Sequence, residues 1–258
     1  ELVFPLDVPM VGIRMEVGSS DGISDGWFIG GGYWRNVCKP LHVMTDSDWF
    51  DAVHVSYTES DTELDMTKAS VDAGFHVMGN DRVSLSLVGH YFYMTASQDV
   101  NGFNGWQRIG ETSDFALISS TAHAIHYQVT YHSPQLGISS IFAMDDFTRF
   151  RLWLSGGMVF ASDVDDHILR GKISEGDATG IGLYAKADLN IMPFGSFGRH
   201  VSLGVFGEFR YFQADGVQTQ RWYRDGGNTP AGTEVSNIPH EFESYQYLIG
   251  LQVCFSFY

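Results

Sequence analysis

The sequence predicts an all-β protein, an antiparallel transmembrane β-barrel formed by residues 1–258 as a single outer-membrane domain. Three observations carry this prediction: apolar and polar residues alternate, the alternating runs are long, and short connections alternate with long ones. The composition fits, with 29 glycines, only 7 prolines and 14% aromatic residues, as is typical of strands and tight turns. No run of about 18 apolar residues indicates a transmembrane helix.

The alternation is clearest in the second half of the chain. In residues 201–211 the odd positions are mainly apolar, whereas Glu208 and Arg210 lie among the even ones, and residues 181–191 and 245–257 alternate in the same way. Such strands are longer than the usual 5–6 residues of soluble proteins, which indicates that the apolar face contacts lipid. The alternative is a soluble barrel such as a lipocalin, with its apolar face inside. A charged face that recurs from strand to strand favours the membrane barrel.

Nine strands are predicted from this pattern, at residues 2–18, 26–39, 64–78, 82–97, 119–143, 149–163, 178–193, 199–222 and 242–258. Bacterial single-chain barrels have even strand numbers, so we expect ten strands, with the missing one before Glu1. The alternation slips within 119–143, and a β-bulge near Pro134 would absorb the extra residue.

The connections divide into two sets by length. The short ones are 19–25, 79–81, 145–148 and 194–200, and the long ones are 40–63, 98–118, 164–177 and 223–241. Short turns of such barrels are periplasmic and long loops extracellular, so each set falls at one end. Cys38 and Cys254 then lie near opposite ends, much further apart than the Cα separation of about 7 Å that a disulfide allows. We expect both to be unpaired.

The charge is strongly negative, with 31 acidic residues, 15 Lys and Arg, and a net charge of −16. A field of this sign repels nucleic acid and attracts cationic partners. Nucleic-acid binding is excluded on this ground, and cationic peptides or proteins are the expected substrates.

Acidic residues gather at the ends of two segments that face the long loops. Asp46 and Asp48 share one face of an extended segment, and Asp163, Asp165 and His167 share the inward face of another, while the neighbouring Asp166 points away. An Asp–His pair suits general-base catalysis, because the carboxylate orients the imidazole and stabilises its charged form. Two close carboxylates do not ionise together easily, so one of them can hold a proton near neutral pH.

Two other interpretations of these acids stay open. Acidic loops are common on barrel exteriors, so the residues alone are also consistent with solvated loop carboxylates. Asp163, Asp165 and His167 could instead bind a divalent cation, although three ligands in five residues of one strand would splay apart. We expect no metal.

The motifs around these residues resemble those of the omptin family. Omptins are ten-stranded outer-membrane barrels that cleave peptides at the cell surface, mostly beside basic residues. Their active site pairs an Asp-x-Asp motif, usually followed by Trp, with an Asp-x-His motif on the opposite wall. Residues 45–51 (TDSDWFD) are similar to the first motif and residues 162–167 (SDVDDH) to the second. The resemblance extends over nearly the whole chain.

The resemblance implies a catalytic dyad of Asp46 and Asp48 opposite a base pair of Asp165 and His167. It implies that Asp163 binds the basic side chain before the cleaved bond. It also implies a bacterial outer-membrane location with the active site facing the cell exterior, no metal cofactor, and a need for lipopolysaccharide among the surrounding lipids. The alternative function is a non-catalytic barrel of the same fold that acts as a structural or binding subunit. A diffusion porin is disfavoured, because side chains mostly fill the lumen of a ten-stranded barrel.

Overall fold

A computed structural model describes residues 2–18, 26–39, 41–80, 82–110, 114–192, 201–226 and 229–255. Apart from one short 3₁₀ turn, η1 (Ile168–Arg170), the regular elements in these ranges are all strands. They are β1 (Leu2–Val3), β2 (Met10–Gly18), β3 (Trp27–Asn36), β4 (Leu41–Phe50), β5 (Val53–Gly79), β6 (Val83–Arg108), β7 (Phe115–Ala143), β8 (Thr148–His167), β9 (Lys172–Ile191), β10 (Val201–Trp222) and β11 (Glu234–Phe255).

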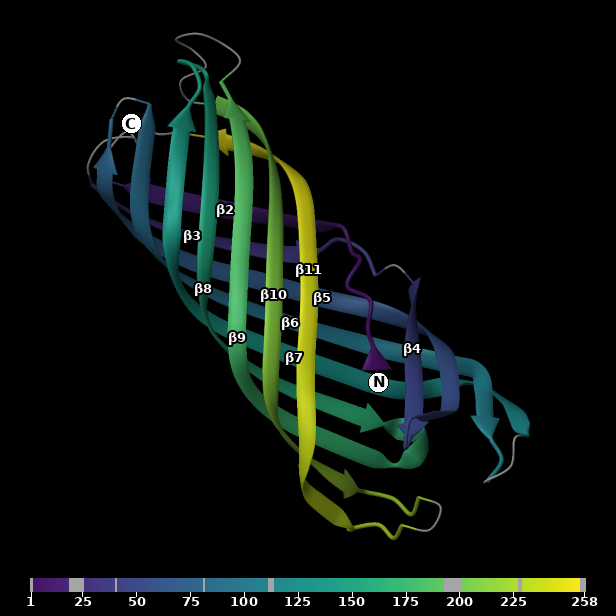
Figure 1. Cartoon of the computed structure of the whole chain (residues 1–258). Helices are drawn as coiled ribbons and strands as arrows, with labels where there is room; N and C mark the ends of the chain where they lie inside the picture. The colour runs from purple at the N-terminus through teal and green to yellow at the C-terminus, as the bar shows by residue number, and fades with distance from the viewer. Residues whose placement is uncertain are drawn as a thin grey trace.

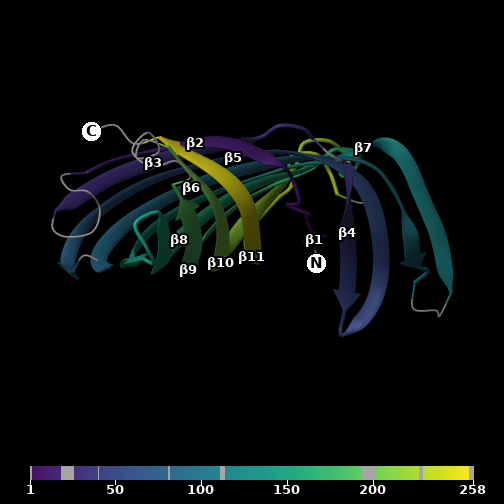
Figure 2. The same cartoon turned by 90° about the horizontal axis from the view of Figure 1, so that it is seen from above.

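All strand pairs are antiparallel and belong to one strongly curved sheet (Figures 1 and 2). From β5 to β11 the strands follow chain order, and β5 pairs with β3 over one half of its length and with β4 over the other. The sheet curls far enough for Glu16 of β2 to meet Arg151 of β8, with Oε2 and Nη1 3.1 Å apart. Among the described residues β2 and β11 share no ladder. The expected tenth strand stays a prediction.

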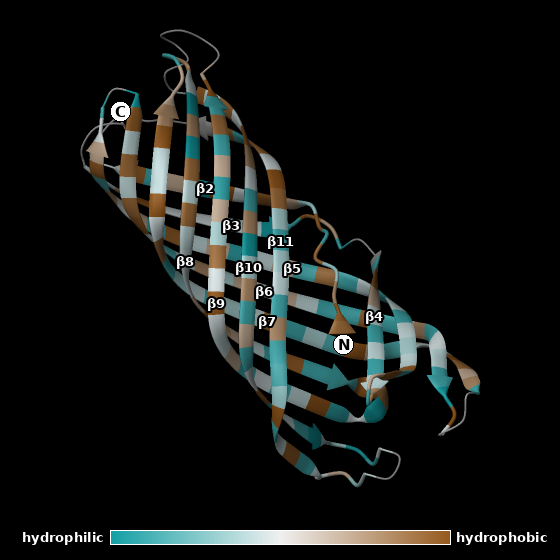
Figure 3. Ribbon diagram, viewed as in Figure 1, coloured by the Kyte–Doolittle hydropathy of each residue, from teal (hydrophilic) through white to brown (hydrophobic). Residues whose placement is uncertain are grey.

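The predicted apolar outer face is confirmed. Large apolar side chains are exposed at every second position of the long strands, as at Ile181 and Leu183 of β9 and at Ile249 and Leu251 of β11. Figure 3 shows the resulting bands of contrasting hydropathy along the strands. In the described part of the chain, no helix is both long and apolar enough to span a membrane.

The prediction of long irregular loops was wrong, because strands continue through most of these segments. Residues 41–63 hold β4 and the start of β5, and residues 98–118 hold the end of β6 and the start of β7. The β4–β5 hairpin closes through Asp51 and Ala52, whose φ angles are 45° and 64°, as in a type I′ turn. These extensions lack the alternating apolar face that identifies a lipid-facing strand, so the period-2 pattern did not detect them.

The predicted bulge near Pro134 is also absent. His132 pairs with Phe160 and Gln135 with Gly157, three steps apart on each strand, so the register of β7 and β8 is unchanged across Pro134. The apolar residues change face for another reason. Val129 and Tyr131 are buried in the lumen, whereas Leu136 and Ile138 beyond Pro134 point outward.

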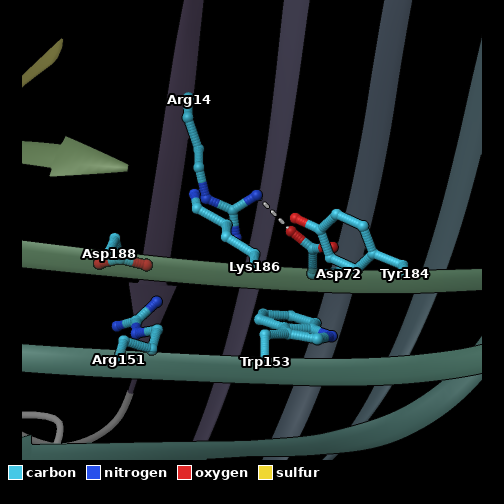
Figure 4. A pocket seen from close by; sticks show the side chains of 7 residues that line it. All are labelled: Arg14, Asp72, Arg151, Trp153, Tyr184, Lys186 and Asp188. Carbon is cyan, nitrogen blue, oxygen red and sulfur yellow. Dashed lines mark ion pairs between the residues drawn. The ribbon is translucent and has the colours of Figure 1, made fainter. Parts of the chain in front are cut away.

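The lumen is filled in layers. Below the acidic residues of β8 lies a buried apolar cluster (the apolar layer), which comprises Leu64, Met66, Phe92, Met94, Ala96, Val129, Tyr131, Val159, Ala161, Ala178, Phe212, Ala214 and Phe242. Beyond it lies a charged layer, where Arg14, Arg151 and Lys186 surround a small pocket together with Asp72 and Asp188 (Figure 4). Such filling suits a barrel that works at its surface rather than as an open pore.

One of the two predicted free cysteines can be checked. Cys38 is exposed and unpaired, which confirms the prediction for this residue. The side chain of Cys254 lies outside the described part of the structure.

Candidate active site

The second predicted motif lies at the end of β8, above the apolar layer. Asp163, Asp165 and His167 occupy alternate positions of the strand and are all buried, at 6%, 7% and 9% exposure. His167 Nε2 lies 2.9 Å from Asp165 Oδ2. Asp166 points to the opposite side, where its Oδ1 accepts a hydrogen bond of 2.8 Å from the Tyr223 hydroxyl. The inward and outward positions are therefore those that the alternation predicts.

The first motif lies on β4, in the β4–β5 hairpin. Asp46 is half-buried and Asp48 is exposed, and the Ser56 hydroxyl of β5 donates a hydrogen bond of 2.8 Å to Asp48 Oδ2. Burial raises the pKa of the Asp46 carboxyl, and the charge of Asp48 raises it further. This pair therefore favours the state in which one carboxyl keeps its proton.

Charges of the second motif act on the first. The charges of Arg170 and His167 act on Asp46 and oppose the rise of its pKa. Burial lowers the pKa of Lys172, the first residue of β9, whereas Asp165, Asp48 and Asp46 raise it. Lys172 is thus within electrostatic reach of both acidic pairs.

Tyr127 of β7 lines the wall beside these acids. It pairs with Asp165 in the ladder between β7 and β8, and its ring stacks on Phe4 with centroids 4.2 Å apart. Tyr127 is partly buried, and the charges of Asp163 and Asp165 act on its phenol. The phenol therefore stays protonated and can donate a hydrogen bond to a developing negative charge.

A further site residue, His240 of β11, was missed in the sequence. Its Nε2 lies 3.2 Å from Asp163 Oδ2, so the predicted substrate-binding acid already has a partner. The signal was present: Phe242, Ser244 and Gln246 are buried at alternate positions, and one more step along the strand reaches His240. The strand predicted from the alternation begins at residue 242 and so leaves His240 outside it.

The roles of Asp46, Asp48, Asp163, Asp165 and His167 stay predictions. Over the described ranges, no group of three or more His, Cys, Asp or Glu side chains is arranged to hold a metal ion. A carboxylate–imidazole pair opposite two coupled carboxylates can deprotonate a water molecule and return a proton to a leaving group.

Comparison with known proteins agrees with this architecture. The sequence model of the Omptin family matches residues 9–255. The crystal structure of the outer membrane protease OmpT from Escherichia coli is similar, with a TM-score of 0.76 and 14% sequence identity over 90% of this chain and 79% of that chain. At this identity the likeness shows the barrel fold alone. No curated protein sequence matches the chain.

Proposed function

Because the chain belongs to the omptin family, we propose that it is a bacterial outer-membrane endopeptidase that cleaves peptides beside basic residues at the cell surface. The observation that carries this proposal is the buried pair of Asp165 and His167, 2.9 Å apart, with the charge of His167 acting on Asp46 of β4. The net charge of −16 favours cationic substrates, such as peptides or proteins rich in Lys and Arg.

The chemistry needs neither a covalent intermediate nor a metal. Asp165 engages Nε2 of His167, which leaves Nδ1 to take a proton from water as the oxygen attacks the peptide carbonyl carbon. The proton shared by Asp46 and Asp48 hydrogen-bonds the oxyanion that forms. The His167 imidazolium then gives its proton to the departing amine, which restores the neutral ring.

Asp163 is the proposed acid for the basic side chain of the substrate. It lies two residues from Asp165 on the same inward face, so a side chain held there leaves the next peptide bond near the base. Lipopolysaccharide is proposed as a required surrounding lipid for activity, with the site facing the cell exterior.

Refolded protein supplied with lipopolysaccharide should cleave fluorogenic peptides that carry Arg or Lys before the scissile bond. A general base contributes about 10²–10⁴-fold in rate, so His167→Ala should lower kcat by about this factor, and Asp165→Asn should cause a comparable loss. Asp166→Ala is the matched control from the opposite face of the same strand and should leave kcat nearly unchanged.

Two results would contradict the proposal. If no basic peptide is cleaved and His167→Ala changes no activity, the non-catalytic barrel takes the place of the protease. If a chelator abolishes activity of the purified, reconstituted protein and zinc or calcium restores it, a metal mechanism replaces general-base catalysis by His167.

A further inference from the structure

The proposed substrate acid is covered by a histidine. The Asp163 side chain is only 3% exposed, whereas the His240 side chain that contacts it is 22% exposed. The imidazole therefore lies on the solvent side of the carboxylate. A ring-to-ring contact with Phe242 holds it there, with centroids 4.3 Å apart at an interplanar angle of 76°.

The space around this pair allows little adjustment. A Cβ atom at Gly176 of β9 would lie 2.4 Å from Asp163 Oδ1 and 2.9 Å from His240 Cδ2, so a larger residue there would displace one of the two side chains. Asp163 Oδ1 is buried without a hydrogen-bond partner among the described residues. A cation that takes the place of the His240 ring beside this carboxylate would meet Oδ2, and Oδ1 is available to it as a second acceptor.

The charge around His240 comes from few groups. The positions of β9 and β10 next to it carry Gly176, Ala178 and Gly216, none of which titrates. From β7, Tyr127 and Tyr131 face Asp163. Phenols ordinarily titrate near about pH 10, so both tyrosines stay neutral over the range in which an imidazole changes its charge.

On the inward face of β8 the ionisable groups next to Asp163 are Asp165 and His167, which pair with each other. Of the ionisable side chains described, His240 is therefore the one whose ring contacts the Asp163 carboxylate, with Nε2 3.2 Å from Oδ2.

We propose that His240 is a specificity-determining residue that competes with the basic side chain of the substrate for Asp163. This inference rests on the proposed function, since it assigns the substrate side chain to Asp163. When His240 is protonated, it neutralises Asp163 and repels a guanidinium or ammonium group. When it is neutral, the negative charge of Asp163 is available to a cation. Affinity for basic substrates thus falls in acid and rises as the pH increases.

Binding of an uncleavable probe separates this effect from catalysis. The probe is a short peptide with a reduced bond after arginine, and its neutral counterpart carries citrulline in place of arginine. Calorimetric titration of the full chain in detergent with lipopolysaccharide should show arginine-probe affinity rising on the order of tenfold from pH 5.5 to 8, as expected for a charge-assisted contact. The affinity for the citrulline probe should stay weak and constant over the same range.

Two substitutions test the residue itself. His240→Ala should tighten arginine-probe binding on the order of tenfold at pH 5.5 and remove the pH dependence. His240→Gln keeps a hydrogen-bonding side chain without the charge, so it should remove the pH dependence without tightening the binding of the arginine probe. This variant keeps the test valid if the alanine variant fails to fold. His126→Gln breaks a second His–Asp contact, to Asp99 at 2.7 Å on the outer face of β7, and should change nothing.

The outcomes distinguish this inference from the proposed function. If arginine peptides are cleaved but the pH dependence persists in both His240 variants, the inference is overturned and the protease stands. If nothing is cleaved but probe binding keeps its His240-dependent pH profile, the cation site stands and proteolysis fails. If the arginine probe binds no better than the citrulline probe at any pH, the role of Asp163 and the role of His240 both fail.

Discussion

Replacing Asp72 by asparagine tests whether the charged layer of the lumen stabilises the barrel. The Asp72 side chain is 1% exposed and contacts two cationic or ionisable partners, Arg14 Nη1 and His90 Nδ1, each at 2.5 Å. Breaking a buried ion pair from one side costs about 3–5 kcal/mol, because the other charge stays buried without its partner. Arg14 keeps a second, longer contact to Glu16 at 3.4 Å, so we expect a loss near the lower end, about 3 kcal/mol.

The matched control is Asp65→Asn at an exposed ion pair. Asp65 is 29% exposed and its partner Arg35, 3.2 Å away, is 60% exposed, and such pairs contribute about 0–1 kcal/mol. The free energy of unfolding of both variants should be measured by guanidinium titration in detergent micelles, with tryptophan fluorescence as the probe. If both variants lose the same free energy of unfolding, less than about 1 kcal/mol, the reasoning is refuted. The cost of desolvating Asp72 would then offset its attraction to its partners in the charged layer.

Two shorter predictions concern packing and the thiol. Gly180→Ala places a Cβ 1.9 Å from the Gln213 carbonyl oxygen, whereas no atom of the described residues lies within 4 Å of a Cβ at Gly207. The first substitution should lower the free energy of unfolding by about 1–3 kcal/mol and the second by less than about 0.5 kcal/mol, as measured by the same titration. Cys38 is exposed and unpaired, so a maleimide reagent should modify it in the folded protein, and mass spectrometry showing protection would contradict the structure.

The sequence predicted the part of each strand that contacts lipid, because one-sided burial in a bilayer imposes a strict period of two. It did not predict β4 or the first half of β5, where both faces of the hairpin are largely polar and no such period arises. The turn at Asp51 and Ala52 lacks the Asn-Gly or Asp-Gly pair that usually signals a two-residue hairpin. Strand segments inside the membrane therefore show a clear alternation of apolar and polar residues, whereas strand segments outside it do not.

Contacts in the candidate active site were likewise predictable only along a single strand. Asp163, Asp165 and His167 could be placed on one face, because neighbours two apart on a strand share a face. The contact between Asp163 and His240 joins β8 to β11, which are not adjacent in the sheet. A periodic pattern within one strand carries no information about which strands meet across the lumen.

The last prediction concerns a conflict between stability and function at Asp46. Burial and the charge of Asp48 raise the pKa of the Asp46 carboxyl above its ordinary value. An acid with a raised pKa in the folded state holds its proton more tightly there than in the unfolded chain. Stability from this group is therefore present at low pH and is lost as the pH rises through the raised pKa. Asp46→Asn, which cannot ionise, should remove this loss.

The free energy of unfolding of Asp46→Asn should thus exceed that of the unsubstituted protein at pH 8 and match it near pH 3.5, where the folded-state carboxyl is mainly protonated. Peptide cleavage should fall strongly at the same time, because the proton shared with Asp48 is lost from the site. Asp165→Asn provides the contrast: it weakens a buried contact to His167, so at pH 8 it should lower both stability and activity. A variant of Asp46 that is less stable at pH 8, or equally stabilised at both pH values, would show that the Asp46 carboxylate is well solvated or well paired. The proton assigned to the pair of Asp46 and Asp48 would then have to come from another group.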